Sequence, residues 1–357
     1  MKKIINKPSE VIQESLKGFA AAYPELVRVH VDPVYVCSTS SPVPGKVAIV
    51  SGGGSGHEPL HTGFVGDGML DAACPGHIFT SPTPDQIYEA AKAVDSGAGV
   101  LFIVKNYSGD VMNFELAIEM AAAEGISVAN VTIDDDIAVR DSLFTQGRRG
   151  MGTTIFAEKI CGAAAQAGYD LQSLAALCGR VNRRGRSIGI ALSPCTVPEH
   201  GKPTFELPPD EFEFGIGIHG EPGRERRAMT SADDLVETMV RSLLEDPLYE
   251  RTAREWDPAA MAWKEEVISS EPFQQGDKLL ALVNSMGGTP ISELYIAYGK
   301  LSEICDRHGM KIARNLIGPF ITSIEMQGIS ITLLRADEDM IEFWDAPVLT
   351  AALQWGV

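Results

Sequence analysis

Short apolar runs that alternate with amphipathic stretches constrain the fold of the first half of this chain more than any other feature. Three runs are short and apolar enough to be buried strands: residues 47–50, 100–104 and 128–133. Three longer stretches have helical spacing: residues 85–94, 113–123 and 154–167. Strands that alternate with helices in this way predict an α/β domain with a mostly parallel or mixed sheet flanked by helices.

The second half contains more strand, and its strands and helices alternate less regularly. Five stretches look extended: residues 187–192, 211–218, 279–283, 311–316 and 329–334. Helices are expected at residues 170–184, 232–244 and 291–308, and Gly185 suits the end of the first of them. We therefore predict two domains, an N-terminal α/β substrate-binding domain (1–184) and a C-terminal mixed α/β, or α+β, domain (185–357).

Charge and cysteine content exclude several classes of function. The 357 residues carry a formal net charge of −18, which opposes binding to nucleic acid or to an anionic membrane. No stretch approaches the roughly 18 apolar residues of a membrane span, and the first residues lack the apolar region of a signal peptide. The six cysteines form no C-x-x-C pair, so we expect reduced, mostly buried thiols in a cytoplasmic protein.

A glycine-rich segment follows the first predicted strand directly. Residues 51–59 read SGGGSGHEP, and their four glycines let the backbone approach a ligand closely. Ligands usually bind at such strand ends in α/β sheets. The dinucleotide fingerprint G-x-G-x-x-G is broken by His57, and no Gly-Lys pair continues into a P-loop. The alternative is a tight structural turn with an exposed histidine.

The next predicted strand ends in residues 105–110, KNYSGD. Carboxyl ends of parallel strands share one edge of a sheet, so Lys105 and Asp110 are expected near His57. A partly buried carboxylate there could act as a general base. The alternative, favoured by spacing alone, is that Asp110 caps the helix that follows.

A second histidine follows the extended segment at residues 211–218. Alternating glycine and apolar residues lead to His219, and this pattern predicts a strand that another backbone approaches closely. A lone histidine is more often a packed or capping residue than a catalytic one. However, the HGEP sequence after His219 echoes the HEP sequence that begins at His57, which is unusual within one chain.

Three charged clusters are weaker candidates. The three aspartates at 134–136 could bind Mg²⁺ through oxygen ligands, but we predict a solvated loop. The arginines of residues 147–150 and 180–186 could meet an acidic or phosphorylated partner, but we predict solvated turns there. We therefore predict no metal site in this chain.

Taken together, these motifs resemble the K subunit of bacterial dihydroxyacetone kinases that work with the phosphoenolpyruvate phosphotransferase system. The resemblance covers essentially the whole chain and rests on GGGSGHEP (52–59), CPG (74–76), FTSPTP (79–84), KNYSGD (105–110), TIDDD (132–136), GRRG (147–150), GIHGEPG (217–223), RNLIG (314–318) and WDAP (344–347). It implies that His219 binds the ketone as a hemiaminal, that Asp110 lies by the hydroxyl receiving phosphate, and that His57 hydrogen-bonds the adduct. Gly54, Ser81 and Lys105 match positions lining the substrate pocket.

The resemblance also implies what the chain lacks and what it needs. Single-chain ATP-dependent relatives carry a helical nucleotide domain after this region, and we expect that domain to be absent here. The chain would then bind no cofactor, and ADP or ATP with Mg²⁺ would sit on a helical nucleotide-binding partner subunit. A homodimer is expected, and a transcriptional regulator is a further candidate partner.

Two other functions stay open. The chain could be a ketone-sensing co-regulator without catalysis, although Asp110 favours the enzyme because a sensor needs only His219. It could also be a kinase subunit for another small ketose, such as a four-carbon sugar.

Overall fold

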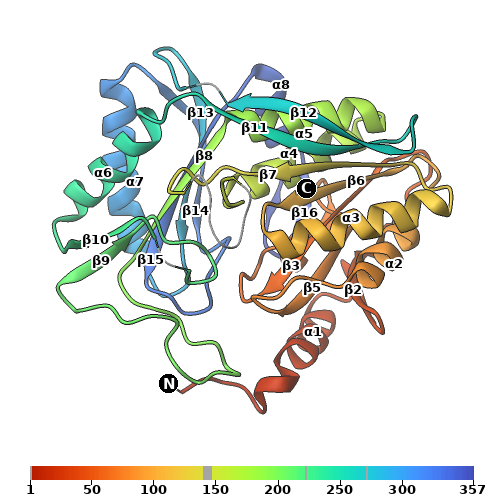
Figure 1. Cartoon of the computed structure of the whole chain (residues 1–357), viewed down its shortest axis with the longest axis horizontal. Helices are drawn as coiled ribbons and strands as arrows, with labels where there is room; N and C mark the ends of the chain where they lie inside the picture. The colour runs from red at the N-terminus through yellow and green to blue at the C-terminus, as the bar shows by residue number, and fades with distance from the viewer. Residues whose placement is uncertain (1, 140–146, 222, 271) are drawn as a thin grey trace.

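The computed structural model describes residues 2–139, 147–221, 223–270 and 272–357, and it is built around two mixed six-stranded sheets (Figure 1). The first sheet has the order β1-β2-β5-β3-β6-β7. Its strands are β1 (Val27–Val31), β2 (Val34–Ser38), β3 (Ala48–Ser55), β5 (Ala72–Ile78), β6 (Val100–Lys105) and β7 (Val128–Ile133). Strands β5, β3, β6 and β7 are parallel, so their carboxyl ends meet at one edge.

The second sheet has the order β10-β9-β8-β15-β13-β14, and only β13 and β14 are parallel. Its strands are β8 (Gly185–Ala191), β9 (Glu211–Phe214), β10 (Glu225–Ala228), β13 (Lys278–Ser285), β14 (Lys311–Gly318) and β15 (Gly328–Arg335). The prediction of an α/β fold with a mixed sheet in each half is confirmed.

Helices cover both faces of each sheet. They are α1 (Val11–Ala22), α2 (Pro84–Val94), α3 (Ser108–Ala123), α4 (Thr153–Gln166), α5 (Leu171–Arg184), α6 (Ala232–Leu244), α7 (Ile291–Arg307) and α8 (Glu338–Asp345), with short 3₁₀ turns at Pro8–Glu10 and Thr62–Phe64. Successive side chains of a strand point to opposite faces. In β6, Leu101 and Ile103 therefore face α4 and α5, whereas Phe102 packs with α2 and α3.

The pair α4 and α5 lies between the two sheets. Their side chains share one hydrophobic core with Leu101 of the first sheet and with Leu280 and Leu282 of the second. On the far side of the second sheet, α6 and α7 pack against Leu279 and Ala281 in a separate core. The sheets are therefore held together by a common buried layer of helices.

The remaining strands tie distant parts of the chain together. Strands β16 (Val348–Thr350) and β17 (Gln354–Trp355) form a small sheet with β4 (Gly66–Asp67) of the first half. The hairpin of β11 (Tyr249–Asp257) and β12 (Ala262–Ser270) reaches back from the second half to α3. Its contacts there include an ion pair between Arg254 and Glu115, with the nitrogen and oxygen 2.6 Å apart.

The predicted boundary between residues 184 and 185 falls where α5 ends and β8 begins, with Gly185 directly after the helix as expected. The first sheet lies wholly before it and the second wholly after it. The C-terminal strands, however, pair with the first half, and one core contains residues from both sides. The division into two domains therefore stays a prediction.

One predicted strand is wrong in its length. Residues 211–218 were expected to be extended throughout, but β9 ends at Phe214. Gly215 has φ +82°, a left-handed conformation that a glycine adopts readily, and the chain turns there. His219 consequently lies in an irregular segment, not at the end of a strand.

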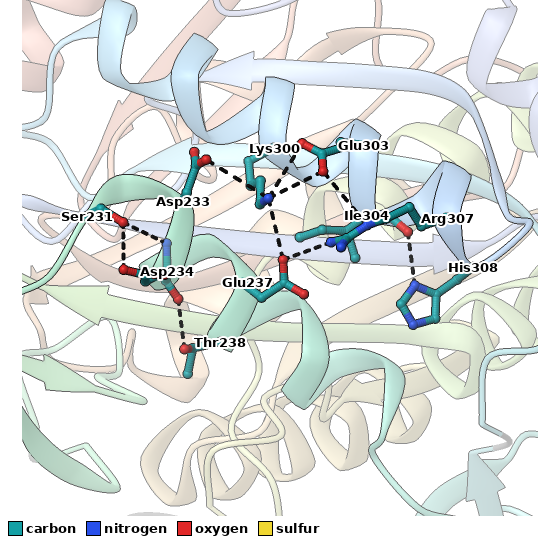
Figure 2. A network of polar contacts seen from close by, with 10 residues as sticks. All are labelled: Ser231, Asp233, Asp234, Glu237, Thr238, Lys300, Glu303, Ile304, Arg307 and His308. Atoms are coloured by element: carbon teal, nitrogen blue, oxygen red, sulfur yellow. Dashed lines mark hydrogen bonds and ion pairs between the residues drawn. The ribbon is translucent and has the colours of Figure 1, made fainter.

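The outer helices α6 and α7 are joined by an exposed network of charges (Figure 2). Glu237 on α6 accepts from Arg307 at 2.8 Å and lies 3.6 Å from the Lys300 ammonium. Exposed ion pairs of this kind contribute at most about 1 kcal/mol each. The buried apolar faces of α6 and α7, not these charges, therefore account for most of their attachment.

Candidate active site

A cavity of about 540 Å³ lies between the carboxyl edge of the first sheet and the irregular segment that carries His219. It is lined by Gly54, Phe79, Thr80, Ser81, Tyr107, Ser108, Gly109, Asp110, Thr204, His219, Gly220 and Glu221. Four of the six predicted site residues are in this lining: Gly54, Ser81, Asp110 and His219. A fifth, His57, has its ring 4.7 Å from that of His219.

The glycine-rich segment reaches the site as a strand rather than as a loop. Strand β3 runs to Ser55, and its glycines are buried. A Cβ atom on Gly54 would lie 2.6 Å from the amide nitrogen of Thr80, which is too close for any side chain. The glycine is thus needed for the close approach of the segment that lines the cavity.

His57 is fully buried and its protonation pattern is set by its contacts. Its Nδ1 lies 2.8 Å from the carbonyl oxygen of Thr322, which can only accept, so Nδ1 carries the hydrogen. Nε2 has no hydrogen-bond partner. Burial, with His219 and Lys105 nearby, holds the pKa of His57 well below its usual value. His57 is therefore a neutral imidazole with a free lone pair, not the exposed histidine of the alternative interpretation.

His219 is enclosed by aromatic rings but remains partly accessible, with 19% of its side chain exposed. The rings of His57, Phe79 and Tyr107 all meet it edge-on, with centroids 4.4–5.3 Å away. Its Nδ1 lies 3.7 Å from Oε1 of Glu221. This carboxylate favours a hydrogen on Nδ1 and leaves the lone pair on Nε2.

Glu221 is a site residue that the sequence reasoning did not select. Its Oε2 accepts the His219 backbone N–H at 2.8 Å, and its Oε1 lies 3.5 Å from Nη1 of Arg149. Burial opposes its charge, yet His219 and Arg149 lower the pKa of Glu221 to about 2. The signal in the sequence was its place in the HGEP motif, two residues after His219.

Asp110 lies in the first turn of α3 and is 2% exposed. Its Oδ1 has no hydrogen-bond partner, and its Oδ2 is 3.9 Å from the Lys105 ammonium. A buried carboxylate oxygen without a partner is costly and calls for an explanation, and a ligand in the adjoining cavity would supply one. The capping alternative is wrong: Tyr107 is the N-cap residue of α3, the cap has no side-chain hydrogen bond, and Asp110 is a buried residue within the helix.

Lys105 is the sixth predicted site residue, and it is not among the residues that line the cavity. It is fully buried behind Asp110, and its Nζ lies 2.6 Å from Nε2 of His61. It reaches the site by way of its charge, which lies 3.9 Å from Oδ2 of the lining residue Asp110.

The three weaker predictions are wrong, the last of them in part. The three aspartates at 134–136 are buried, not solvated: Asp135 accepts from the backbone N–H groups of Met151 and Thr153, and Asp136 accepts from Arg149 at 2.7 Å. The arginine-rich segment at 147–150 is buried as well. The charges pair with residues distant in sequence, which composition alone could not indicate.

The arginine cluster at 180–186 was also expected to be solvated, but Arg186 is fully buried and donates to Asp246 at 2.7 Å. Asp246 additionally forms a two-pronged pair with Arg148, at 2.7 and 3.0 Å. These paired charges anchor the segment that leads to Arg149, and thus support Glu221 indirectly.

Three further expectations concern the cysteines, metal binding and membrane-spanning helices. All six cysteines are free and buried, as predicted. Within the ranges that the structure describes, no cluster of three or more His, Cys, Asp or Glu side chains is arranged to hold a metal ion. Among the same residues, no helix has the length and apolar character needed to cross a membrane.

Comparison with known proteins shows the family. Residues 17–352 match the family model described as the Dak1 domain. The chain belongs to the Dak1 family. Within this family it is 53% identical, over the full length of both chains, to the dihydroxyacetone-binding subunit DhaK of the PEP-dependent dihydroxyacetone kinase of Escherichia coli. The resemblance inferred from the motifs is thereby confirmed, and the chain is a member of the group of dihydroxyacetone kinase subunits.

Two solved structures share the Dak1 fold with this chain. The dihydroxyacetone kinase of C. freundii matches with a TM-score of 0.83 and 30% identity, over 99% of this chain and 60% of that one. The dihydroxyacetone kinase operon co-activator DhaQ matches with a TM-score of 0.81 and 32% identity, over 97% and 98% of the two chains. A kinase and a co-activator thus share this architecture.

Proposed function

We propose that this chain binds dihydroxyacetone covalently on His219 and presents one of its hydroxyl groups to a phosphoryl donor carried by a partner subunit. The product would be dihydroxyacetone phosphate. The observation that carries the proposal is that a partly accessible imidazole, His219, and a buried carboxylate, Asp110, face one cavity, and that Oδ1 of Asp110 has no hydrogen-bond partner. Full-length similarity to a dihydroxyacetone-binding subunit supports the choice of ketone.

The covalent step uses the lone pair of His219. Nε2 attacks the carbonyl carbon of the ketone, the carbon–oxygen π bond breaks, and its electrons form an alkoxide. The alkoxide gains one proton as Nδ1 loses one, so the hemiaminal is neutral overall. Glu221 stabilises the positive ring formed in between, because its carboxylate lies 3.7 Å from Nδ1. The free Nε2 of His57 can accept a hydrogen bond from the new hydroxyl and assist the proton movement.

The covalent bond fixes the substrate for the second step. A three-carbon molecule held in one pose reacts as part of the protein, and such orientation contributes several kcal/mol to lowering a barrier, on the order of 7–11 at best. The hydroxyl oxygen of the bound ketone forms a bond to phosphorus while Asp110 accepts the hydroxyl proton. The bond between phosphorus and the leaving group on the donor breaks in the same step. Glycerol has no carbonyl group and should therefore be a poor substrate.

The donor side of the reaction belongs to the partner in this proposal. Phosphoryl transfer needs Mg²⁺ and positive groups around the phosphate. We assign ADP or ATP and Mg²⁺ to a helical nucleotide-binding subunit that docks over the cavity mouth. We also retain a homodimer and a cytoplasmic location as part of the proposal, and six free thiols suit a reducing compartment.

A second candidate is a ketone-sensing co-regulator, and the likeness to the co-activator DhaQ supports it. The two functions differ in one measurement. The chain is mixed with dihydroxyacetone and a nucleotide-binding partner subunit loaded with ATP and Mg²⁺, and dihydroxyacetone phosphate is measured by a coupled assay. Turnover supports the kinase subunit, whereas adduct formation without turnover supports the co-regulator. Replacing dihydroxyacetone with a four-carbon ketose in the same assay tests the third alternative.

A further inference from the structure

A line of buried polar side chains leads from Asp110 into the interior, away from the cavity. The Lys105 ammonium lies 3.9 Å from Oδ2 of Asp110 and 2.6 Å from Nε2 of His61. On its other side, Nδ1 of His61 lies 2.5 Å from Oε1 of Glu158 on α4. All four side chains are at most 4% exposed. The line thus joins the proposed base to the helix layer between the two sheets.

The donors and acceptors along this line have one consistent order. An ammonium only donates hydrogen bonds, so Nε2 of His61 accepts from Lys105. The hydrogen of the neutral ring is then on Nδ1, which donates to Glu158. The hydroxyl of Ser51 donates to the carbonyl of Ile103 at 2.7 Å and lies 3.1 Å from the same Nδ1. His61 is therefore held in one tautomer from both sides.

A structural role does not account for one carboxylate oxygen in this line. Oε2 of Glu158 is buried and has no hydrogen-bond partner. A buried carboxyl group that served only packing would be destabilising, because removing it from water costs free energy that its contacts must recover. The group is therefore better explained by its effect on the charges in front of it.

We propose that His61 and Glu158 are positioning residues that hold the Lys105 ammonium beside Asp110. The attraction between this positive charge and Oδ2 of Asp110, 3.9 Å away, holds the carboxylate in place for the transfer step. Asp110 then remains able to accept the proton of the substrate hydroxyl. This inference rests on the proposed function, since it concerns the base of the same transfer step.

The electrostatics of the line agree with this arrangement. Burial lowers the pKa of Lys105, and the charges of Asp110 and Glu158 oppose that decrease. Burial likewise raises the pKa of Glu158 to about 8, with the Lys105 charge opposing. Burial also holds the pKa of His61 well below its usual value.

Groups from each neighbouring element face this line. They are Asp110 from α3, His57 and His61 from the segment after β3, Glu158 from α4 and, within range of the Glu158 charge, the Cys178 thiol from α5. The two histidines are neutral, so the balance near Lys105 is set by the two carboxyl groups. Glu158 gains its charge as the pH rises through about 8, and from there it helps Lys105 retain its proton.

The test is Glu158→Gln, which keeps an oxygen for Nδ1–H of His61 but cannot ionise. The rate of phosphoryl transfer by the complete system with its nucleotide-loaded partner is measured from pH 6 to pH 10. Below about pH 7 the variant should match the unchanged chain, because Glu158 is neutral there and glutamine is neutral at every pH. Above about pH 8 its kcat should fall earlier, with the alkaline limb displaced by about one pH unit and a tenfold lower rate on that limb. KM for dihydroxyacetone should change less than twofold.

Thr154→Val is the matched control. Thr154 lies one turn before Glu158 on α4, is fully buried, and has an unpaired hydroxyl, but it lies outside the line. Its pH profile should match that of the unchanged chain. Identical profiles for Glu158→Gln and the unchanged chain up to pH 10 would overturn the inference. Failure of the proposed function appears differently, as absence of the His219 adduct in the unchanged chain by mass spectrometry.

A second measurement does not depend on whether the Glu158→Gln variant folds. ¹⁵N NMR of the histidine rings distinguishes the tautomers, and the signals of His61 are identified by their loss in His61→Gln. We expect a hydrogen on Nδ1 and none on Nε2 from pH 6 to pH 9. A hydrogen on Nε2 would mean that Lys105 does not donate to the ring, and the proposed order would be wrong.

Discussion

The two walls of the cavity are built in different ways. On one side, His57 and Asp110 follow directly from the regular strands β3 and β6, whose parallel pairing fixes their ends at one edge. On the other, His219 lies in an irregular segment after β9, where Gly215 turns the chain. That segment is held by side chains, since Glu221 contacts both the His219 backbone and Arg149.

We call the side with His57 and Asp110 the regular wall and the side with His219 the tethered wall, and we expect them to serve different steps of the reaction. The regular wall carries the groups proposed to move protons, whose positions follow from backbone pairing. The tethered wall carries the proposed nucleophile, whose ring orientation depends on a chain of charges from Glu221 to Arg149 and Asp136. Changes in the tethered wall should therefore affect adduct formation first, and changes at Asp110 in the regular wall should affect transfer.

The largest effect is expected from His219→Ala, which removes the proposed nucleophile. No covalent adduct with dihydroxyacetone should be detected by mass spectrometry, and phosphoryl transfer should fall to background. His200→Ala, an exposed histidine in the same half of the chain, is the control and should retain the adduct. An adduct that survives His219→Ala would place the nucleophile elsewhere.

Asp110→Asn should distinguish adduct formation from phosphoryl transfer most clearly. The adduct should remain, because Asp110 takes no part in forming it, while kcat should fall by about 10²–10⁴, the usual contribution of a general base. Adduct and turnover are measured on the same sample by mass spectrometry and the coupled assay. Asp85→Asn, an exposed acid in the first turn of α2, is the matched control. Full activity in Asp110→Asn would remove Asp110 from the mechanism.

A smaller effect is expected from Glu221→Gln, which tests the tether itself. The pKa of Glu221 is about 2, so its charge is present throughout the neutral range and is lost only in strong acid. Removing it should weaken the apparent affinity for dihydroxyacetone about tenfold, or about 1.4 kcal/mol, by calorimetric titration. Glu225→Gln on β10 should have no effect. If Glu221→Gln lowers transfer but leaves affinity unchanged, the proposed division between the walls is wrong.

The regular wall was largely predictable from the sequence. Strands β6 and β7 are buried on both faces, so their apolar residues form short runs that local pattern can identify. The hairpin of β11 and β12 was missed because it lies on the surface and is rich in charged residues, such as Arg254. It is held by contacts with distant parts of the chain that no local pattern encodes, such as the bonds between Asn130 of β7 and the backbone of Arg254 and Trp256.

The tethered wall was less predictable for a related reason. Gly-x-Gly alternation at residues 215–217 resembles a strand, but Gly215 has a left-handed φ of +82°, and a Cβ atom there would lie 2.7 Å from that of Ala138. The burial of Asp136 and Arg149 depends on their mutual pairing across the site, and solvated loops were the better expectation without it. Positions such as Asp110 and His57 were found because their motifs resemble those of a family, and the structure added Glu221, His61 and Glu158.

The most direct test of the central claim is a crystal structure of the unchanged chain soaked with dihydroxyacetone. The account predicts continuous electron density between Nε2 of His219 and a tetrahedral carbon of the sugar, with one of its hydroxyl groups within hydrogen-bond distance of Asp110. Density for a planar, unattached ketone in the cavity, or bound sugar distant from the His219 ring, would contradict it.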